Sequence, residues 1–115
     1  MISLQVDEAY AFDYLAILHT KILKLNSAKS SELFNQVYNS IEKQIGAETA
    51  KDIINSNEYK NLLKANIDVF DAVEKARKEE PIDGRIMDNL NQKRFEAKKV
   101  IQAKFFSSDL QEIKS

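Results

Sequence analysis

The most hydrophobic stretch of the chain lies near its start, where residues 9–18 read AYAFDYLAIL. Asp13 is the only acid in this stretch, among aromatic, aliphatic and small side chains. On a helix that turns by about 100° per residue, the apolar positions of residues 9–25 cover an arc of roughly 240°. A helix on the outside of a small bundle needs an apolar stripe only a little wider than about 100°. We therefore expect a helix over about residues 7–25 that is either central in the fold or in contact with another subunit.

Three more helical segments follow, with apolar residues that recur at three- and four-residue spacing. They are predicted at about residues 30–46, 48–79 and 84–106. The middle segment should break near residues 55–57, because the sequence Asn-Ser-Asn is typical of turns and helix caps. Pro81 and Gly84 then separate it from the last helix, since proline disfavours a helical residue before it and glycine permits a sharp turn.

The two ends of the chain carry weaker signals. Ile2, Leu4 and Val6 alternate with polar residues, which favours a short extended N-terminal arm. At the other end, Ser108 can cap a short C-terminal helix through Ile113. Because the connections between the main helices are short, consecutive helices should be antiparallel. The sequence thus predicts one all-α domain over residues 1–115, arranged as an up-and-down four-helix bundle.

Composition narrows the class of protein further. The chain has 115 residues, of which 43% are hydrophobic and 30% charged, as in an ordinary globular domain. It has no cysteine, so disulfides and thiolate metal sites are excluded. No apolar run approaches the roughly 18 residues of a membrane span, and the formal net charge of −1 provides no field to attract nucleic acid or anionic lipid. We expect a soluble, cytoplasmic protein that does not associate with membranes.

Excess apolar surface on two of the predicted helices points to self-association. Tyr10, Tyr14 and Ile17 extend the apolar arc of the first helix beyond what an intrachain core needs. Phe95 and Phe106 lie close together in angle on the last helix, away from its main apolar stripe. A symmetric interface between copies explains both features, so these five residues are the candidate contact surface of a homodimer or higher homo-oligomer.

A candidate polar cluster at the core edge comprises Glu8, His19 and Arg94. His19 is the only histidine, and Ala16 stands where a Glu-x-x-His metal motif would need its glutamate, so a packed core histidine is favoured over a ligand or general base. Arg94 projects into the apolar stripe of the last helix. Either its aliphatic stem covers the core edge while the guanidinium reaches water, or it pairs with a carboxylate, for which Glu8 is the candidate.

Asp13 itself is less unusual than its apolar neighbours suggest. On the helical wheel it shares a narrow polar wedge with Thr20 and Lys24. We therefore interpret the first helix as a contact surface and do not expect a buried acid site at Asp13.

The favoured function is that of a small all-α interaction or accessory protein, and the abundance of asparagine, lysine and isoleucine would suit a bacterium or phage. One alternative is weak nucleic-acid binding by the basic last helix, where Lys98 and Lys99 lie near aromatic rings. Another is a Mg²⁺-dependent nucleotide-processing enzyme that uses Asp68, Asp71 and Glu74, although nearby lysines favour a salt-bridged surface. The sequence assigns no catalytic residue, cofactor or metal site.

Overall fold

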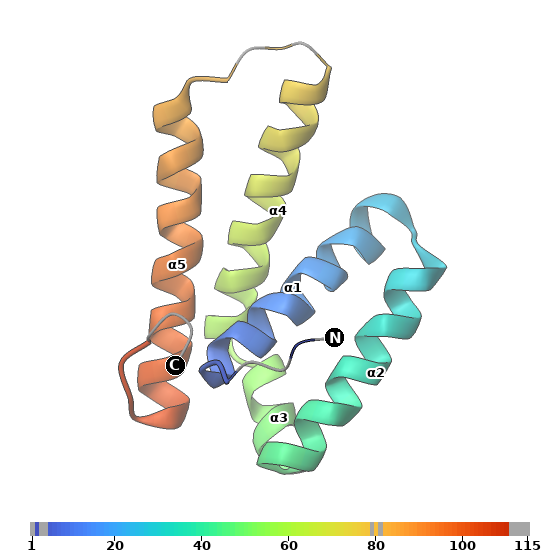
Figure 1. Cartoon of the computed structure of the whole chain (residues 1–115), viewed down its shortest axis with the longest axis vertical. Coiled ribbons are helices and arrows are strands. Elements are labelled where there is room, and N and C mark those ends of the chain that lie inside the picture. The colour runs from blue at the N-terminus through green and yellow to red at the C-terminus, as the bar shows by residue number, and fades with distance from the viewer. Residues whose placement is uncertain (1, 3–4, 79, 81, 111–115) are drawn as a thin grey trace.

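The all-helical fold predicted from the sequence is confirmed in a computed structural model that describes residues 2, 5–78, 80 and 82–110. Within these residues the helices are α1 (Glu8–Leu25), α2 (Ala28–Ile45), α3 (Ala47–Ile54), α4 (Asn57–Arg77) and α5 (Gly84–Phe106). The expected break near residues 55–57 is present and separates the short α3 from α4 (Figure 1).

Two boundaries differ from the sequence prediction. α2 begins at Ala28 because Ser27 acts as its N-cap and accepts a hydrogen bond from the Ser30 amide at 3.1 Å. The link between α1 and α2 is therefore only two residues long, and Asn26 makes the turn with a left-handed backbone (φ 49°). After α5, residues 108–110 are not helical, so the expected C-terminal helix does not start at Ser108; residues 111–113 lie outside the described part of the chain.

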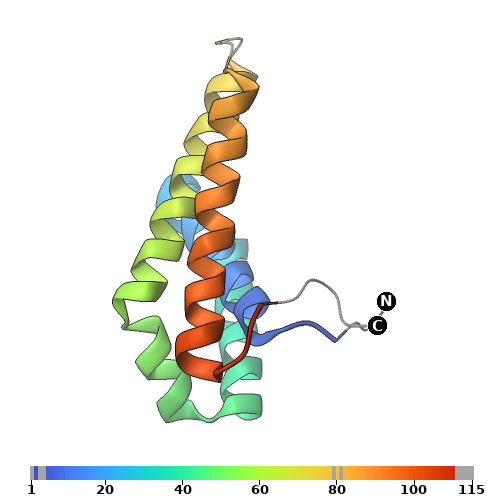
Figure 2. The ribbon, with the colours of Figure 1, turned by 90° about the vertical axis from the view of Figure 1, so that its left-hand side faces the viewer.

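The helices form two antiparallel pairs that meet along α1. α4 and α5 stand side by side as a long hairpin, and Figure 1 shows the α1–α2 pair inclined to that hairpin; Figure 2 shows the hairpin from the side. α1 packs against α2, α4 and α5, and it supplies much of the core through Ala9, Phe12, Leu15 and Ala16. The wide apolar arc of α1 is thus explained in large part by its contacts with three other helices. No helix in the described residues is long and apolar enough to cross a bilayer.

The start of α1 is held by a side chain from the opposite end of the chain. Asp7 occupies the predicted N-cap position, but its side chain makes no capping hydrogen bond. The Ala9 amide instead donates to Oε1 of Gln102 on α5 at 2.9 Å, and Gln102 Nε2 donates to Ser108 Oγ at the same distance. Because Ala9 and Gln102 are fully buried, the first bond satisfies an N–H group and a side-chain oxygen that water does not reach. Gln102 thus couples the first turn of α1 to the end of α5.

We expect Gln102→Leu to lower the free energy of unfolding by about 1–3 kcal/mol, because it leaves the buried Ala9 amide without an acceptor. Urea denaturation followed by circular dichroism would measure this loss. Gln92→Leu on the exposed side of the same helix is the matched control, and it should change the stability by no more than about 0.5 kcal/mol. Equal effects of the two substitutions would contradict the coupling.

Candidate functional site

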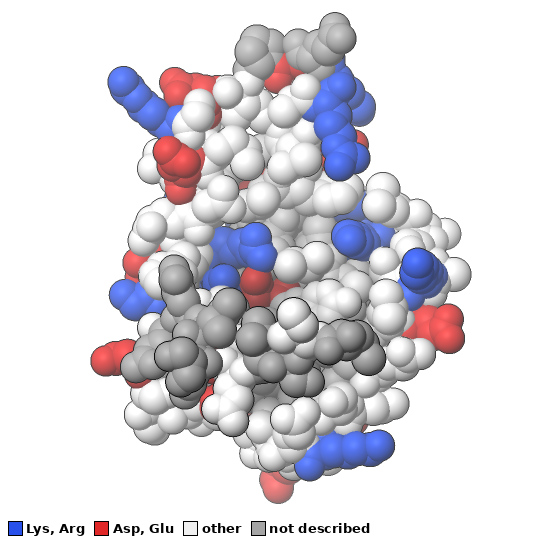
Figure 3. Space-filling view, viewed as in Figure 1, with Lys and Arg blue, Asp and Glu red and all other residues white. Residues whose placement is uncertain are grey.

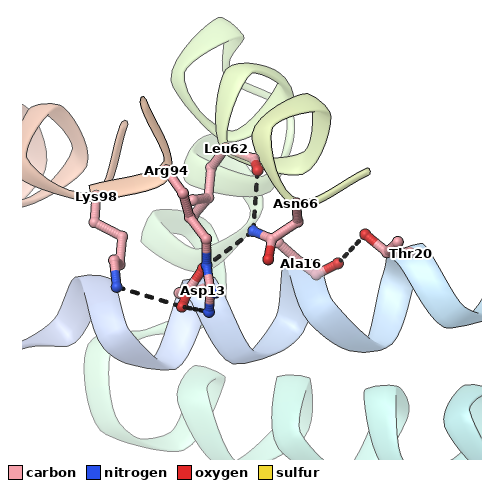
Figure 4. A network of polar contacts seen from close by, with 7 residues as sticks. All are labelled: Asp13, Ala16, Thr20, Leu62, Asn66, Arg94 and Lys98. Carbon is pink, nitrogen blue, oxygen red and sulfur yellow. Dashed lines mark hydrogen bonds and ion pairs between the residues drawn. The ribbon is translucent and has the colours of Figure 1, made fainter. Parts of the chain in front are cut away.

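A buried carboxylate joins the three helices that meet at the centre of the molecule (Figure 4). Asp13 on α1 accepts two hydrogen bonds from Arg94 on α5, from Nε to Oδ1 at 3.0 Å and from Nη2 to Oδ2 at 2.6 Å. Asn66 Nδ2 on α4 donates to Oδ1 at 3.0 Å and also to the carbonyl oxygen of Leu62. Lys98 Nζ lies 3.5 Å from Oδ2. Asp13 is thus held by a two-point guanidinium contact, an amide and an ammonium group.

The network is shielded from water on most sides. Asp13 is 5% exposed, and the side chains of Arg94 and Lys98 are 25% and 12% exposed. Burial alone would raise the pKa of Asp13, but the hydrogen bonds from Arg94 and Asn66 and the charges of Arg94 and Lys98 outweigh it and hold the pKa below its usual value. The carboxylate is therefore ionised at neutral pH. Two cations face one carboxylate, so the cluster carries an excess positive charge.

This arrangement overturns the interpretation of Asp13 drawn from the helical wheel. The polar wedge that Asp13 shares with Thr20 is buried, since Thr20 is only 2% exposed and donates to the carbonyl oxygen of Ala16 at 2.8 Å. Only Lys24, at the end of the wedge, reaches the surface, where it pairs with Asp71. A wheel shows which residues of one helix share a face, but it does not show that other helices supply partners for polar groups on that face.

The structure does not bring together the predicted polar cluster of Glu8, His19 and Arg94. Arg94 does pair with a carboxylate, but that carboxylate is Asp13 and not Glu8. Glu8 instead lines a depression between the start of α1 and the end of α2. His19 lies elsewhere on α1, where Nδ1 is 3.2 Å from the hydroxyl of Tyr59 and the ring meets Phe34 edge-on. The three residues therefore lie in separate sites and do not form one polar cluster.

The His19 environment favours a neutral imidazole. Burial lowers the pKa of His19 and raises that of Tyr59 far above its usual value. The phenol can donate to Nδ1 when the ring proton is on Nε2. His19 is therefore a packed histidine with one hydrogen-bond partner, as the sequence favoured.

Four of the five predicted contact residues lie in three different environments, and the fifth, Ile17, lines the groove described next. Tyr14 is 45% exposed, while Tyr10 and Phe95 are half-buried beneath lysines: Lys98 Nζ lies 4.8 Å from the Tyr10 ring centroid, and Lys99 Nζ lies 5.8 Å from that of Phe95. Phe106, by contrast, packs against the core, with its ring centroid 6.4 Å from that of Phe12. The position of Phe106 away from the main stripe of α5 is explained by α1 within the same chain.

A groove lies beside the charged network, between α1 and α4, with Arg94 of α5 in its wall. Its volume is about 350 Å³. Apolar side chains from α1 and α4 make up much of the lining, and the charged groups around them include three cations and one carboxylate. The apolar members are Ile17, Leu25, Val69, Phe70 and Val73, and the charged members are Lys21, Arg77, Arg94 and Glu74.

The other charged groups named by the sequence are mostly engaged with one another. On α5, Lys99 lies 3.9 Å from Glu96, and Lys104 pairs with Glu58 of α4. On α4, the three acids pair with neighbouring cations: Asp68 with Lys64, Asp71 with Lys24 and Glu74 with Arg77. Figure 3 shows the lysines and arginines dispersed over the face that it presents. Among the described residues, no group of three potential metal ligands is found.

Comparisons with known proteins add no relative. No protein-family model matches the chain, and no curated protein or solved structure matches it. The fold and the site therefore define an all-helical protein with a charged network at its centre, and any function must be argued from these features.

We expect Asp13→Asn to lower the free energy of unfolding by about 3 kcal/mol at neutral pH, because Arg94 and Lys98 then lack their carboxylate in a shielded site. Since the pKa of Asp13 is lowered by folding, the stabilisation is present above about pH 4 and is lost as pH falls through the folded-state pKa. Urea denaturation of both proteins across this pH range would show the difference shrinking in acid.

Asp71→Asn is the matched control, because it removes a carboxylate from an exposed ion pair with Lys24. Its cost should be no more than about 1 kcal/mol. If Asp13→Asn cost no more than this control, the network would not be the main electrostatic stabiliser of the fold.

The protein should become less stable as pH falls from about 7 to 5, by at most about 1.4 kcal/mol per pH unit. Burial lowers the pKa of His19, so the unfolded chain takes up a proton at a higher pH than the folded chain does. His19→Phe should remove most of this dependence, whereas Tyr59→Phe should keep it, because burial and not the hydrogen bond causes the shift. Denaturant titrations at several pH values test this, and an unchanged slope in His19→Phe would refute it.

Proposed function

We propose that this chain is a small helical interaction protein that acts as a homo-oligomer through the outward side of α1. The observation that carries the proposal is the unusual environment of three residues on this helix, whose other buried residues are apolar. Its polar residues Asp13 and Thr20 are buried against the other helices, while the aromatic ring of Tyr14 is 45% exposed. A helix on the surface of a monomer usually has the opposite arrangement, with polar residues toward water.

The outward surface of α1 is continuous in sequence and in angle. Tyr10, Tyr14 and Ile17 follow one another at four- and three-residue spacing, so they lie on one face over two helical turns. None of the three is fully buried within the chain. Aromatic residues with a polar tip are enriched where one protein surface meets another. This face therefore has the composition of a contact surface.

Phe95 extends the proposed surface onto α5, which packs beside α1. Phe106 no longer belongs to it, because it packs on Phe12. A surface made of one continuous patch can meet its own copy about a twofold axis, which favours a closed dimer over an open chain of subunits.

Two finer expectations accompany this proposal. We infer that the four long helices are a tilted variant of the up-and-down bundle, supported by the antiparallel α1–α2 and α4–α5 pairs in Figure 1. We also place the protein in the cytoplasm, a proposal that rests on the absence of cysteine from the sequence and on its ordinary globular composition.

The two alternative functions have less support. Binding of nucleic acid by α5 would need a row of cations that face phosphates together, but Lys98 contacts Asp13 of α1 and Lys104 contacts Glu58 of α4. Mg²⁺-dependent catalysis would need converging carboxylates, whereas Asp68 and Asp71 pair with lysines from different helices. No specific observation favours either alternative.

We expect Tyr14→Glu to lower the molar mass measured by light scattering toward that of a single chain, because a charge at the centre of an apolar contact must be desolvated without a partner. Asn35→Glu places the same charge on an exposed position of α2 and should leave the mass unchanged. Circular dichroism would establish that both variants are folded. A wild-type protein that is monomeric at high concentration would overturn the proposal.

A further inference from the structure

We propose that the groove between α1 and α4 is a binding site for a small organic anion that has a carboxylate head and an apolar tail. The site is the groove described above, with Arg94 in its wall and a volume of about 350 Å³. This proposal does not rest on self-association, because the features that argue for it are the lining and the charges of the groove within one chain.

The apolar part of the groove suits a hydrocarbon tail. Val69, Phe70 and Val73 line it from α4, and Ile17 and Leu25 line it from α1. Leu25 is among the exposed large hydrophobic residues, so part of this wall remains open to water. The volume lies at the lower end of the roughly 300–1,000 Å³ typical of small-molecule sites. A tail placed here would cover apolar surface that no described side chain covers.

The polar part of the groove suits an anion. Asp13 fixes the Arg94 guanidinium through Nε and Nη2, and Nη1 makes no hydrogen bond within the described part of the chain. A guanidinium that is already oriented can offer its remaining N–H groups without further ordering. Lys98 also approaches the Asp13 carboxylate, so this single acid does not neutralise both cations. A ligand carboxylate at Arg94 would balance the excess charge.

The rim of the groove is also positively charged. Lys21 forms no ion pair with any described residue, and the Arg77–Glu74 contact is long, at 3.5 Å. The charged groups in the lining are three cations and one carboxylate. Asp13 is not part of the lining, although it pairs with Arg94. A cationic head of the same size would be repelled here, and an uncharged head would lose the charge-assisted hydrogen bonds.

The proposal is tested by titration calorimetry with three probes that share one tail: decanoate, decanol and decylammonium. All are used below their micelle concentrations with the wild-type full chain. We expect decanoate to bind at one site per chain, at least about tenfold more tightly than decylammonium, with decanol weaker than decanoate. Absence of decanoate binding, or equal binding of the cationic probe, would overturn the proposal.

A pair of charge-reversal variants locates the site. Lys21→Glu changes the rim of the groove and should weaken decanoate binding by about fivefold or more. Lys29→Glu changes the net charge equally at an exposed position of α2 outside the groove, and it should leave binding unchanged. Both positions are exposed, so both variants should fold. If the two variants weakened binding equally, the anion would be attracted by net charge alone and the groove would not be its site.

Discussion

The fold depends on one carboxylate placed where three helices meet. Asp13 gives α1 a partner on α4 through Asn66 and a partner on α5 through Arg94. Apolar packing is non-directional and does not by itself set the register of one helix against another. The two hydrogen bonds from Arg94 to Asp13 have defined geometry and set the position of α5 along α1. Because a buried carboxylate without cations would be costly, helix arrangements that separate Asp13 from Arg94 are disfavoured. The charged network thus adds directional contacts between α1, α4 and α5 to the non-directional apolar packing.

Helix positions could be read from the sequence because periodicity and breakers are local signals. Residues 55–57 and Gly84 marked the ends of helices, and the structure places ends there. The burial of Asp13 could not be read in this way, because it depends on two partners 53 and 81 residues further along the chain. Arg94 stands in an apolar stripe, which predicts a carboxylate partner, and the structure shows that partner to be Asp13. The sequence points to Glu8 instead, because a helical wheel contains no information about neighbouring helices.

The candidate contact residues lie in different environments. The sequence predicts that Tyr14 lies outside the intrachain core, and 45% of its surface is exposed. The angle of Phe106 departs from the main apolar stripe of α5 and predicts the same contact surface as for Tyr14, but α1 reaches that side of α5 and the ring of Phe12 packs against that of Phe106. The groove had no sequence signal, because Ile17 and Val73 belong to different helices and the pattern along one helix says nothing about the other. Only their relative placement leaves a space between them.

The hydrogen bond between the Ala9 amide and Gln102 has a consequence for the order of folding. It spans 93 residues, so the first turn of α1 is completed only when nearly the whole chain is present. Because Arg94 also comes late in the sequence, a nascent chain that ends before α5 holds Asp13 without a cation. Contacts of such long sequence separation are slow to form. The side of α1 that packs on α5 is therefore uncovered until the last helix has been synthesised.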